Sequence, residues 1–446
     1  MTSWNVPELV DTVPLSFSER LMWQTECARL DGVPFIDCAS NLLIGARIRG
    51  RLDVRALRRS VSAIVERHDV LRSTVRELDG QPCRIVGPVT GDECQCIDLR
   101  DCPLEVRTAG EARIIKQELG KAINLRVGPL FRAILITVAD HEHVFACIVH
   151  HLVFDGWSKA VFARELKSAY EAYSSGRVPE LPLLPLQHAD YVRWQQSRFS
   201  DERVDTAAMA MAARLSQASA NALTGACRSG ARGAATRTLW IDAERTEALR
   251  RASGAHGVTL AVLLLSVFVT LLRRATGHND VLVGVPLSDR RRPDFQGLIG
   301  LFVDVAVARM DGVASTDFGE TVRHVRERLR EAYAAHQAVP YGSFLRWAHQ
   351  RSVHTPNLRF LFSFHNDVPG AEIELPGLVT EDLGVVAGRQ QALADLSLLI
   401  AWRQGGLKCV LSATHATGLA DDVDRCVEWF DAVVSSLDDR RVLTCQ

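Results

Sequence analysis

The sequence has little lysine and no excess of charge of either sign. Its 446 residues carry 52 Lys and Arg against 53 Asp and Glu, which gives a formal net charge of −1. A protein that is held on a duplex by phosphate contacts needs a basic face. The charge balance therefore argues against nucleic acid as a partner. A hydrophobic share of 47% with a charged share of 24% excludes a disordered or fibrous chain.

The cysteine spacing shows neither a disulfide framework nor a zinc site. The eleven cysteines are an odd number, and no two of them form a Cys-x-x-Cys arrangement. A chain of this length can build its core without disulfides, so we expect free thiols in a reducing compartment. Cys94, Cys96 and Cys102 could be a fragment of a metal site, but their stretch lacks a fourth ligand. We predict no bound metal.

Long hydrophobic runs are also missing. The longest run, Leu260–Leu272, is shorter than the ~20 residues that a helix needs to cross a bilayer. The first residues, Met-Thr-Ser-Trp-Asn-Val-Pro-Glu, lack the basic and apolar regions of a secretion signal. We therefore expect a soluble, cytoplasmic protein with no membrane partner.

Three motifs of common enzyme chemistries are absent. The sequence contains no G-x-x-x-x-G-K-[ST], no G-x-G-x-x-G and no G-x-S-x-G. The first two motifs cradle phosphates, and the third presents a nucleophilic serine. Neither nucleotide-driven chemistry nor a serine-hydrolase elbow is therefore supported.

Helix and strand patterns alternate along both halves of the chain. Asp53 is placed to cap a helix with helical apolar spacing, and residues 144–149 are apolar throughout, as in a strand buried on both faces. The other predicted elements of the first half are strands at 42–48 and 131–138 and helices at 111–123 and 161–173. Those of the second half are strands at 280–286, 301–309 and 358–365, a hairpin at 396–402 and 407–414, and helices at 258–274, 317–336 and 419–437. The alternation predicts an α/β fold.

A proline-rich linker separates the two halves. Pro179, Pro182 and Pro185 lie within residues 176–186, which is a linker composition. We therefore predict two lobes, residues 1–178 and 179–446. The Ala-, Ser- and Gly-rich stretch 207–235 is expected to start as a helix and to contain a mobile loop at 225–233.

The strongest candidate site follows the buried strand at 144–149. His150 and His151 leave this strand, and Asp155 and Gly156 stand just before the next helix. Ends of central strands are where α/β folds place functional groups, and a glycine there allows close approach of a ligand or backbone. Adjacent strand residues point to opposite faces, so only one histidine can face a given cleft. A neutral imidazole can take a proton from an amine or a hydroxyl group.

Two other interpretations remain open on spacing alone. The histidines can have solvated or core roles at a strand end, with Asp155 simply capping the next helix. A zinc site could use His141, His143, His150 or His151, but the first two lie in a polar turn and no fixed set of four ligands is evident. If Asp155 is buried, it needs a cationic partner.

Six segments, read in order, resemble the condensation domains of non-ribosomal peptide synthesis, which are relatives of chloramphenicol acetyltransferase. His150-His151-x-x-x-Asp155-Gly156 resembles the HHxxxDG signature. The other five are Leu15–Trp23 (similar to LSxAQxRLW, with Ser18-Glu19 in place of Ala-Gln), Arg67–Thr74 (RHExLRT), Ala189–Trp194 (YxDYAVW), Arg290–Asp304 (NRxRP…IGLFVNT) and His336–Tyr341 (HQDxPFE). The resemblance covers nearly the whole chain.

The resemblance implies two acetyltransferase-like lobes in a V, with a tunnel between them that is open on both faces. By motif position His151 is the catalytic histidine, with Gly156 in the same signature, and His150 is mainly structural. Asp155 is implied to form an ion pair with Arg290 of the second lobe. In that role Asp155 organises the site and is not a second base.

Three further residues, Trp157, Ser158 and Asp304, are expected to line the tunnel. Asp304 stands where the family has the Asn of FVNT, and His415 stands where a late motif has Tyr. We find no adenylation domain and no carrier-protein serine motif. The chain therefore resembles the free-standing members that act in siderophore and enediyne pathways.

The implied activity is an acyl transfer. A donor acyl or aminoacyl group arrives as a phosphopantetheinyl thioester on a separate acyl or peptidyl carrier protein, and a small-molecule amine or alcohol attacks it to give an amide or an ester. No bound cofactor is expected, because the thioester supplies the driving force. An epimerase is one alternative, although Trp157 precedes Ser158 as in condensation members. A non-catalytic recruitment module is another, although such members lose the second His or the Gly.

Overall fold

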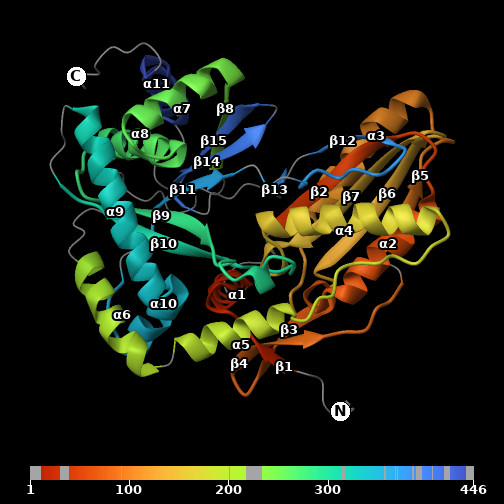
Figure 1. Cartoon of the computed structure of the whole chain (residues 1–446), viewed down its shortest axis with the longest axis horizontal. Helices are drawn as coiled ribbons and strands as arrows, with labels where there is room; N and C mark the ends of the chain where they lie inside the picture. The colour runs from red at the N-terminus through yellow and green to blue at the C-terminus, as the bar shows by residue number, and fades with distance from the viewer. Residues whose placement is uncertain are drawn as a thin grey trace. The chain divides into compact units, whose positions relative to one another are not determined.

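The structure is a computed structural model, and it falls into two compact units. It describes residues 12–30, 40–91, 93–199, 201–216, 234–312, 317–355, 358–366, 368, 370–383, 386–387, 394–403, 405–415 and 422–437. The first unit comprises Met1–Arg198, Asp289–Phe302 and Val368–Arg389. The second unit comprises Phe199–Ser288, Val303–Asp367 and Gln390–Gln446. Each unit combines a sheet with packed helices (Figure 1).

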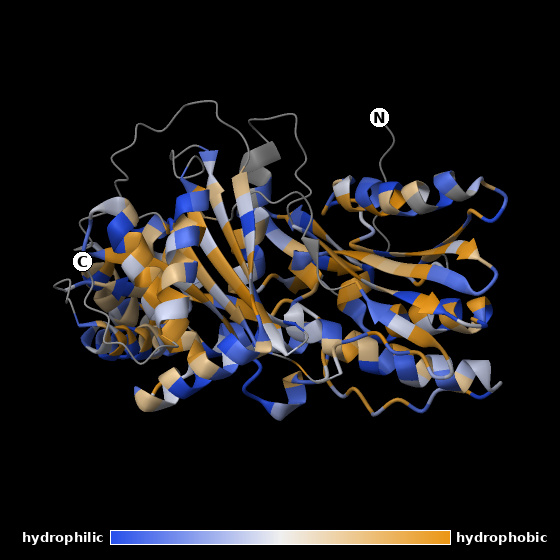
Figure 2. Ribbon diagram, turned by 90° about the horizontal axis from the view of Figure 1, so that it is seen from above, coloured by the Kyte–Doolittle hydropathy of each residue, from blue (hydrophilic) through white to orange (hydrophobic). Residues whose placement is uncertain are grey.

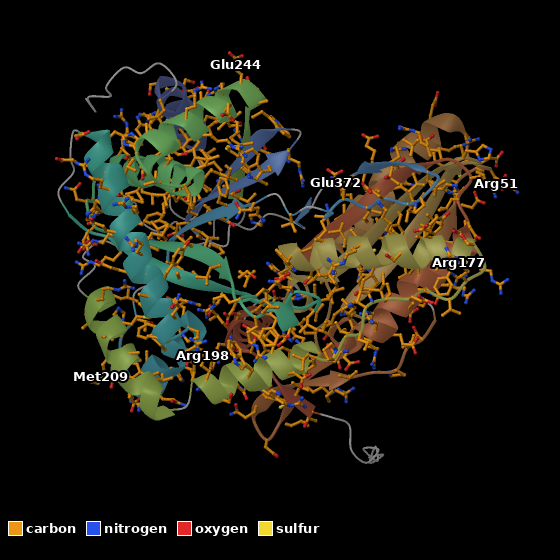
Figure 3. The ribbon with its side chains drawn as sticks, viewed as in Figure 1. Arg51, Arg177, Arg198, Met209, Glu244 and Glu372 are labelled. Carbon is orange, nitrogen blue, oxygen red and sulfur yellow. The ribbon has the colours of Figure 1, made fainter. Side chains whose placement is uncertain are left out.

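The division differs from the expected boundary at residue 178. The first unit continues to Arg198, and it takes two segments from the second half of the sequence. The reason is a small apolar cluster in which Tyr191 and Val192 pack with Phe295, Leu298 and Phe302. The proline-rich stretch therefore leads back to the first unit, and the chain passes to the second one only beyond Arg198, which Figure 3 labels.

The first unit is built on a sheet of strand order β12-β2-β7-β6-β5, with β13 also paired to β2. The strands are β2 (Asn41–Arg49), β5 (Cys94–Asp98), β6 (Phe131–Ala139), β7 (Glu142–His150), β12 (Val379–Asp382) and β13 (Val386–Ala387). A second, three-stranded sheet has the order β1-β4-β3, with β1 (Thr12–Pro14), β3 (Ser73–Leu78) and β4 (Gln81–Val86). The helices are α1 (Phe17–Leu30), α2 (Val54–Arg67), α3 (Leu104–Gly120), α4 (Gly156–Ser174) and α5 (His188–Arg198), and three 3₁₀ turns lie at Asp69–Arg72, His151–Val153 and Pro293–Phe295.

The strand β7 lies at the centre of the first unit's core. It pairs antiparallel with β2 on one side and with β6 on the other. Each side chain from Val144 to Val149 is fully buried. Because alternate side chains point to opposite faces, both faces of the sheet are covered here. Figure 2 shows this as hydrophobic colour along the strands and on the inner faces of the helices.

The second unit is built on a six-stranded sheet of order β10-β9-β11-β14-β15-β8. The strands are β8 (Ala234–Ile241), β9 (Val281–Ser288), β10 (Val303–Met310), β11 (Phe360–His365), β14 (Leu396–Arg403) and β15 (Gly406–Thr414). The helices are α6 (Asp201–Ser216), α7 (Ala243–Ala255), α8 (Leu260–Thr276), α9 (Phe318–Ala338), α10 (Tyr341–Gln350) and α11 (Val423–Ser436). The core of this unit includes the apolar residues of α8, which explains the longest hydrophobic run of the sequence.

Most of the predicted elements are confirmed, with shifted ends. Asp53 caps α2 by accepting a hydrogen bond from the Ala56 amide at 2.9 Å. The hairpin of β14 and β15 is present. The helix predicted at 111–123 begins earlier, at Leu104, and helix α1 was not predicted. The expected mobile loop at 225–233 lies outside the described residues.

None of the single helices in the described ranges has the length and apolar content of a bilayer span. The pair α7 and α8 passes such a test together, but the two helices meet at 93° and most of α8 is buried in the core of the second unit.

Candidate functional site

The two adjacent histidines leave the central strand in different environments. His150 is the last residue of β7 and is buried, with 2% of its surface exposed. His151 begins the 3₁₀ turn that follows and is half-buried. The backbone of this turn is anchored, because the His150 amide donates to the Leu130 carbonyl at 2.9 Å and the His151 amide donates to the Ser40 carbonyl at 2.8 Å.

His150 is held as a neutral imidazole with its proton on Nε2. Its Nδ1 accepts a hydrogen bond from the Leu152 amide at 3.1 Å, so Nδ1 carries no proton. Its Nε2 faces the Glu26 carboxylate, at 3.9 Å from Oε1. Burial, and secondarily the neighbouring His151, lower the pKa of His150 to about 3. His150 is therefore a structural group that closes the end of the strand.

His151 has the opposite tautomer. Its Nδ1 lies 2.7 Å from the carbonyl oxygen of Phe154. A carbonyl oxygen only accepts hydrogen bonds, so Nδ1 carries the proton. The neutral ring then has its lone pair on Nε2, and the hydrogen bond of the other nitrogen fixes the ring's orientation. This is the arrangement of a general base, and the half-buried position gives the ring partial access to solvent.

Asp155, four residues after His151, forms a buried ion pair with Arg290. Asp155 is 1% exposed and Arg290 is 6% exposed. Arg290 Nη2 lies 3.0 Å from Asp155 Oδ1 and 3.3 Å from Oδ2. The second terminal nitrogen of Arg290 donates to two backbone carbonyls, those of Phe295 at 2.8 Å and Leu298 at 2.7 Å. Burial lowers the pKa of Arg290, and Asp155 works against this shift.

Asp155 also caps helix α4. Its Oδ1 accepts hydrogen bonds from the amide and the hydroxyl group of Ser158, both at 2.8 Å. Its Oδ2 accepts one from the Phe302 amide at 3.2 Å. The capping role and the ion-pair role are therefore both filled by one carboxylate. A carboxylate with this many donors is fixed in place, so the start of α4 is fixed relative to the 289–302 segment.

The ion pair lies within the first unit. The resemblance implied an arginine of the second lobe, and Arg290 does come from the second half of the sequence. The structure differs, because the segment Asp289–Phe302 is part of the first unit. The physical reason is that the apolar side chains of this segment pack against Tyr191 and Val192 of α5, and the Phe302 amide donates to Asp155. Within the segment, the Phe302 ring lies under the Arg290 guanidinium, whose carbon is 3.8 Å from the ring centroid.

The other signature residues take separate positions. Gly156 is the exposed first residue of α4. Trp157 is 37% exposed, and its indole nitrogen donates to the Gln296 carbonyl at 2.8 Å. Ser158 was expected to line a tunnel, but it is fully buried, and its hydroxyl oxygen accepts a hydrogen bond from the Gly300 amide at 3.1 Å. The position of Ser158 therefore indicates a structural role.

Asp304 belongs to the second unit and is buried, with 4% exposed. Its Oδ2 lies 3.1 Å from Nε2 of His336, which is also 4% exposed. Its Oδ1 accepts from the Val305 amide at 2.7 Å. Both oxygens of its carboxylate therefore have a polar partner within the second unit, and its expected place on a substrate tunnel stays a prediction.

Sequence patterns missed several partners of the site. The Phe154 carbonyl, the Phe302 amide and the Glu26 carboxylate each form a contact with a signature residue. Phe154 and Phe302 lie inside segments that the resemblance singled out, but their backbone groups were not predicted to take part, and Glu26 lies outside all six segments. Within the residues that the structure describes, no group of three or more His, Cys, Asp or Glu is placed to hold a metal ion.

The comparisons with known proteins agree with one another. The family model described as "Condensation domain" matches residues 14–436. The chain belongs to the condensation-domain family. It is 30% identical over 419 residues to the chondramide synthase cmdD of Chondromyces crocatus, a match that spans 92% of this chain but only 10% of that protein. It is 28% identical over 412 residues to the phosphinothricin tripeptide synthetase PhsC of Streptomyces viridochromogenes, spanning 88% of this chain and 36% of that protein.

Two solved structures show the same fold for this condensation domain. The condensation domain of the monacolin K polyketide synthase MokA has a TM-score of 0.80 at 19% identity, covering 97% of this chain and 98% of that one. The protein SgcC5 of Streptomyces globisporus has a TM-score of 0.76 at 21% identity, covering 95% and 99%. This condensation domain is thus of the type found in non-ribosomal peptide synthesis, and it spans only a small part of the large synthases that it matches.

Proposed function

We propose that this condensation domain transfers an acyl or aminoacyl group from a carrier-protein phosphopantetheinyl thioester to an amine or alcohol acceptor. The observation that supports the proposal best is the tautomer of His151. An imidazole whose Nδ1–H is bound to the Phe154 carbonyl offers Nε2 as a base. The phosphopantetheine is part of the substrate and arrives with the carrier protein.

In the proposed reaction the acceptor nitrogen or oxygen attacks the thioester carbonyl carbon. A C–N or C–O bond forms, and the C–S bond breaks. The proton of the acceptor passes to Nε2 of His151 and then to the departing sulfur, which leaves as the carrier thiol. An alcohol depends more on this base than an amine does, because its own pKa is far higher.

His150 and Asp155 support this chemistry without sharing it. His150 stays neutral because its burial lowers its pKa to about 3. Asp155 is bound by Arg290, Ser158 and Phe302 and has no oxygen left for a proton transfer. Its effect on His151 is one of position, since Asp155 fixes the end of the turn that His151 begins.

The test is a single-turnover assay with a separately prepared carrier protein loaded with an acyl thioester. Release of the carrier thiol is followed with and without a small amine or a small alcohol, and the product is identified by mass spectrometry. Acceptor-dependent release with formation of an amide or ester is the expected result. Carrier binding without any release, over a panel of donors and acceptors, would instead favour a recruitment module.

A further inference from the structure

A second buried polar cluster lies in the first unit, away from the two histidines. Glu19 from α1, Arg84 from β4 and His188 from α5 are all at most 2% exposed. Arg84 Nη2 pairs with Glu19 Oε1, and Arg84 Nη1 lies 2.9 Å from Nδ1 of His188. The other oxygen of Glu19 accepts the Ser16 amide at 2.8 Å. Burying these groups is unfavourable unless each donor and acceptor has a hydrogen-bond partner. The cluster is therefore stable only if its hydrogen bonds donate in a consistent direction.

The hydrogen bonds of the cluster run in one direction. A guanidinium group only donates, so Nδ1 of His188 accepts and carries no proton. The proton is then on Nε2, which lies 3.2 Å from the Leu301 carbonyl and donates to it. The chain of contacts thus runs from Glu19 through Arg84 and His188 to the backbone of the 289–302 segment.

His188 touches this segment at three successive residues. Gly300 has φ of +157°, and a Cβ at that position would lie 2.1 Å from Cδ2 of His188, so no other residue fits. The Leu301 carbonyl accepts the imidazole proton. The Phe302 ring lies edge-on to the imidazole, with 4.9 Å between centroids.

The same short backbone stretch holds Asp155. The Phe302 amide donates to Asp155 Oδ2 at 3.2 Å, and the Gly300 amide donates to the Ser158 hydroxyl group at 3.1 Å. His188 contacts one side of residues 300–302, and the capped start of α4 contacts the other. A shift of this backbone would change the donor set of Asp155.

We propose that Glu19, Arg84 and His188 form a positioning unit that fixes residues 300–302 and, through them, the Asp155 end of the histidine-bearing turn. The proposal deepens the acyl-transfer function and, for its kinetic part, rests on it. The three residues touch no substrate. They act by holding two backbone amides where the carboxylate needs them.

Two substitutions at one residue separate the two halves of the contact chain. In His188→Asn the amide oxygen can still accept from Arg84, but the side chain is too short to reach the Leu301 carbonyl. In His188→Gln the longer amide can still donate to that carbonyl, but the acceptor for Arg84 is lost. Both variants are expected to lose stability, so stability alone does not distinguish them.

The deciding measurement is amide hydrogen exchange of residues 298–304, which needs no activity. His188→Asn is expected to lose about tenfold in protection of the Gly300 and Phe302 amides, whereas His188→Gln retains most of it. In the acyl-transfer assay His188→Asn is expected to lower kcat about tenfold with little change in KM, because it misplaces a group without removing a binding contact.

His68→Asn is the matched control. His68 is a buried histidine of the same unit whose Nε2 lies 2.9 Å from Glu165 Oε2, and within the described residues it forms no hydrogen bond, ion pair or ring contact with residues 300–302. This variant should lose stability without a local change in exchange at 298–304. Wild-type protection in His188→Asn, or an equal loss in the control, overturns the proposal.

Glu19→Gln provides a second route if His188→Asn fails to fold. It keeps the shape of the side chain but removes the charge that faces Arg84, and a smaller loss of protection at residues 300–302 is expected. Unchanged protection there overturns the proposal. If exchange responds as expected but no variant and no wild-type protein transfers an acyl group, the positioning unit stands and the acyl-transfer function fails.

Discussion

In the first unit the strands β2, β7, β6 and β5 lie side by side, and in the second unit β8, β15, β14 and β11 repeat their pairing. The first two pairs are antiparallel and the third is parallel in both units. Val149 of β7 and Ala413 of β15 occupy matching positions, each paired to both neighbouring strands. The residues that follow are His150–His151 in one unit and Thr414–His415 in the other.

The two strand ends differ in what surrounds them. Asp155 caps α4, is buried and pairs with Arg290. Asp422 stands before α11 and makes no side-chain capping bond within the described residues, and its partner Arg425 is exposed. A repeated fold therefore does not repeat the site, because the chemistry depends on side chains that only one copy has.

The largest expected effect is on the ion pair. Asp155→Ala and Arg290→Ala each leave a buried charge without its partner and should cost on the order of 3–5 kcal/mol in the free energy of unfolding. The double variant should lose less than the sum, with a coupling above ~1 kcal/mol. Denaturant titrations of the four proteins measure this. Asp422→Ala is the control in the second unit and should change stability by less than about 0.5 kcal/mol. Additive single effects would mean that Asp155 acts only as a helix cap.

The next effect concerns the matching histidines. His151→Ala should lower acyl transfer at least ~10²-fold, the usual scale for a positioned acid–base group, with the fold intact. His415→Ala should leave turnover close to the wild-type value. Single-turnover rates and circular dichroism of both variants provide the check. Equal losses would show that the second strand end takes part in the reaction.

A smaller effect is the pH dependence that His150 confers. Its pKa of about 3 in the folded protein lies below the ordinary value of 6.5, so the unfolded chain takes up the proton first. The contribution of neutral His150 to the free energy of unfolding is complete above about pH 6.5 and is lost as the pH falls towards 3. The free energy of unfolding then falls by at most about 1.4 kcal/mol per pH unit. In His150→Asn, whose amide oxygen can accept from Leu152, the midpoint of unfolding should fall less steeply with acidification. Parallel curves would show that His150 does not remain neutral.

The smallest effect is expected at Asp304. In Asp304→Asn the amide oxygen can still accept a hydrogen bond from Nε2 of His336, whereas Asp155→Asn removes the charge that faces the Arg290 guanidinium. We expect Asp304→Asn to lower the free energy of unfolding by less than about 1 kcal/mol, whereas Asp155→Asn should lower it by several kcal/mol. Thermal unfolding of the two variants tests this. A loss at Asp304 as large as that at Asp155 would show that the charge of the Asp304 carboxylate is needed for stability.

The sequence predicted those parts of the fold that depend on local patterns. The unbroken apolar run at 144–149 predicted a strand buried on both faces, and Asp53 predicted a helix start. The boundary at 178 differs from the observed units, because the packing of Tyr191 on Phe302 joins residues more than a hundred positions apart. No local pattern records such a contact.

The site was predictable to a similar extent. The position of His150 and His151 at a strand end follows from the apolar run, but their opposite tautomers depend on the Leu152 amide and the Phe154 carbonyl. The partner of Asp155 came from the resemblance alone. The resemblance implies that Ser158 and Asp304 line a tunnel, which stays a prediction; their hydrogen bonds with the Gly300 and Val305 amides were not predictable from it.

The discontinuous make-up of the first unit has a consequence for how the chain acquires its structure during synthesis. When residue 198 has been made, β2 still lacks β12, which pairs with it through residues 379–382. Asp155 lacks Arg290, and the core lacks Ile373 and Leu375. An unpaired strand edge favours misassociation, and so does a buried carboxylate without its cation. A fragment that ends at residue 198 should therefore aggregate, and the nascent chain should depend on its last third before its first third can close.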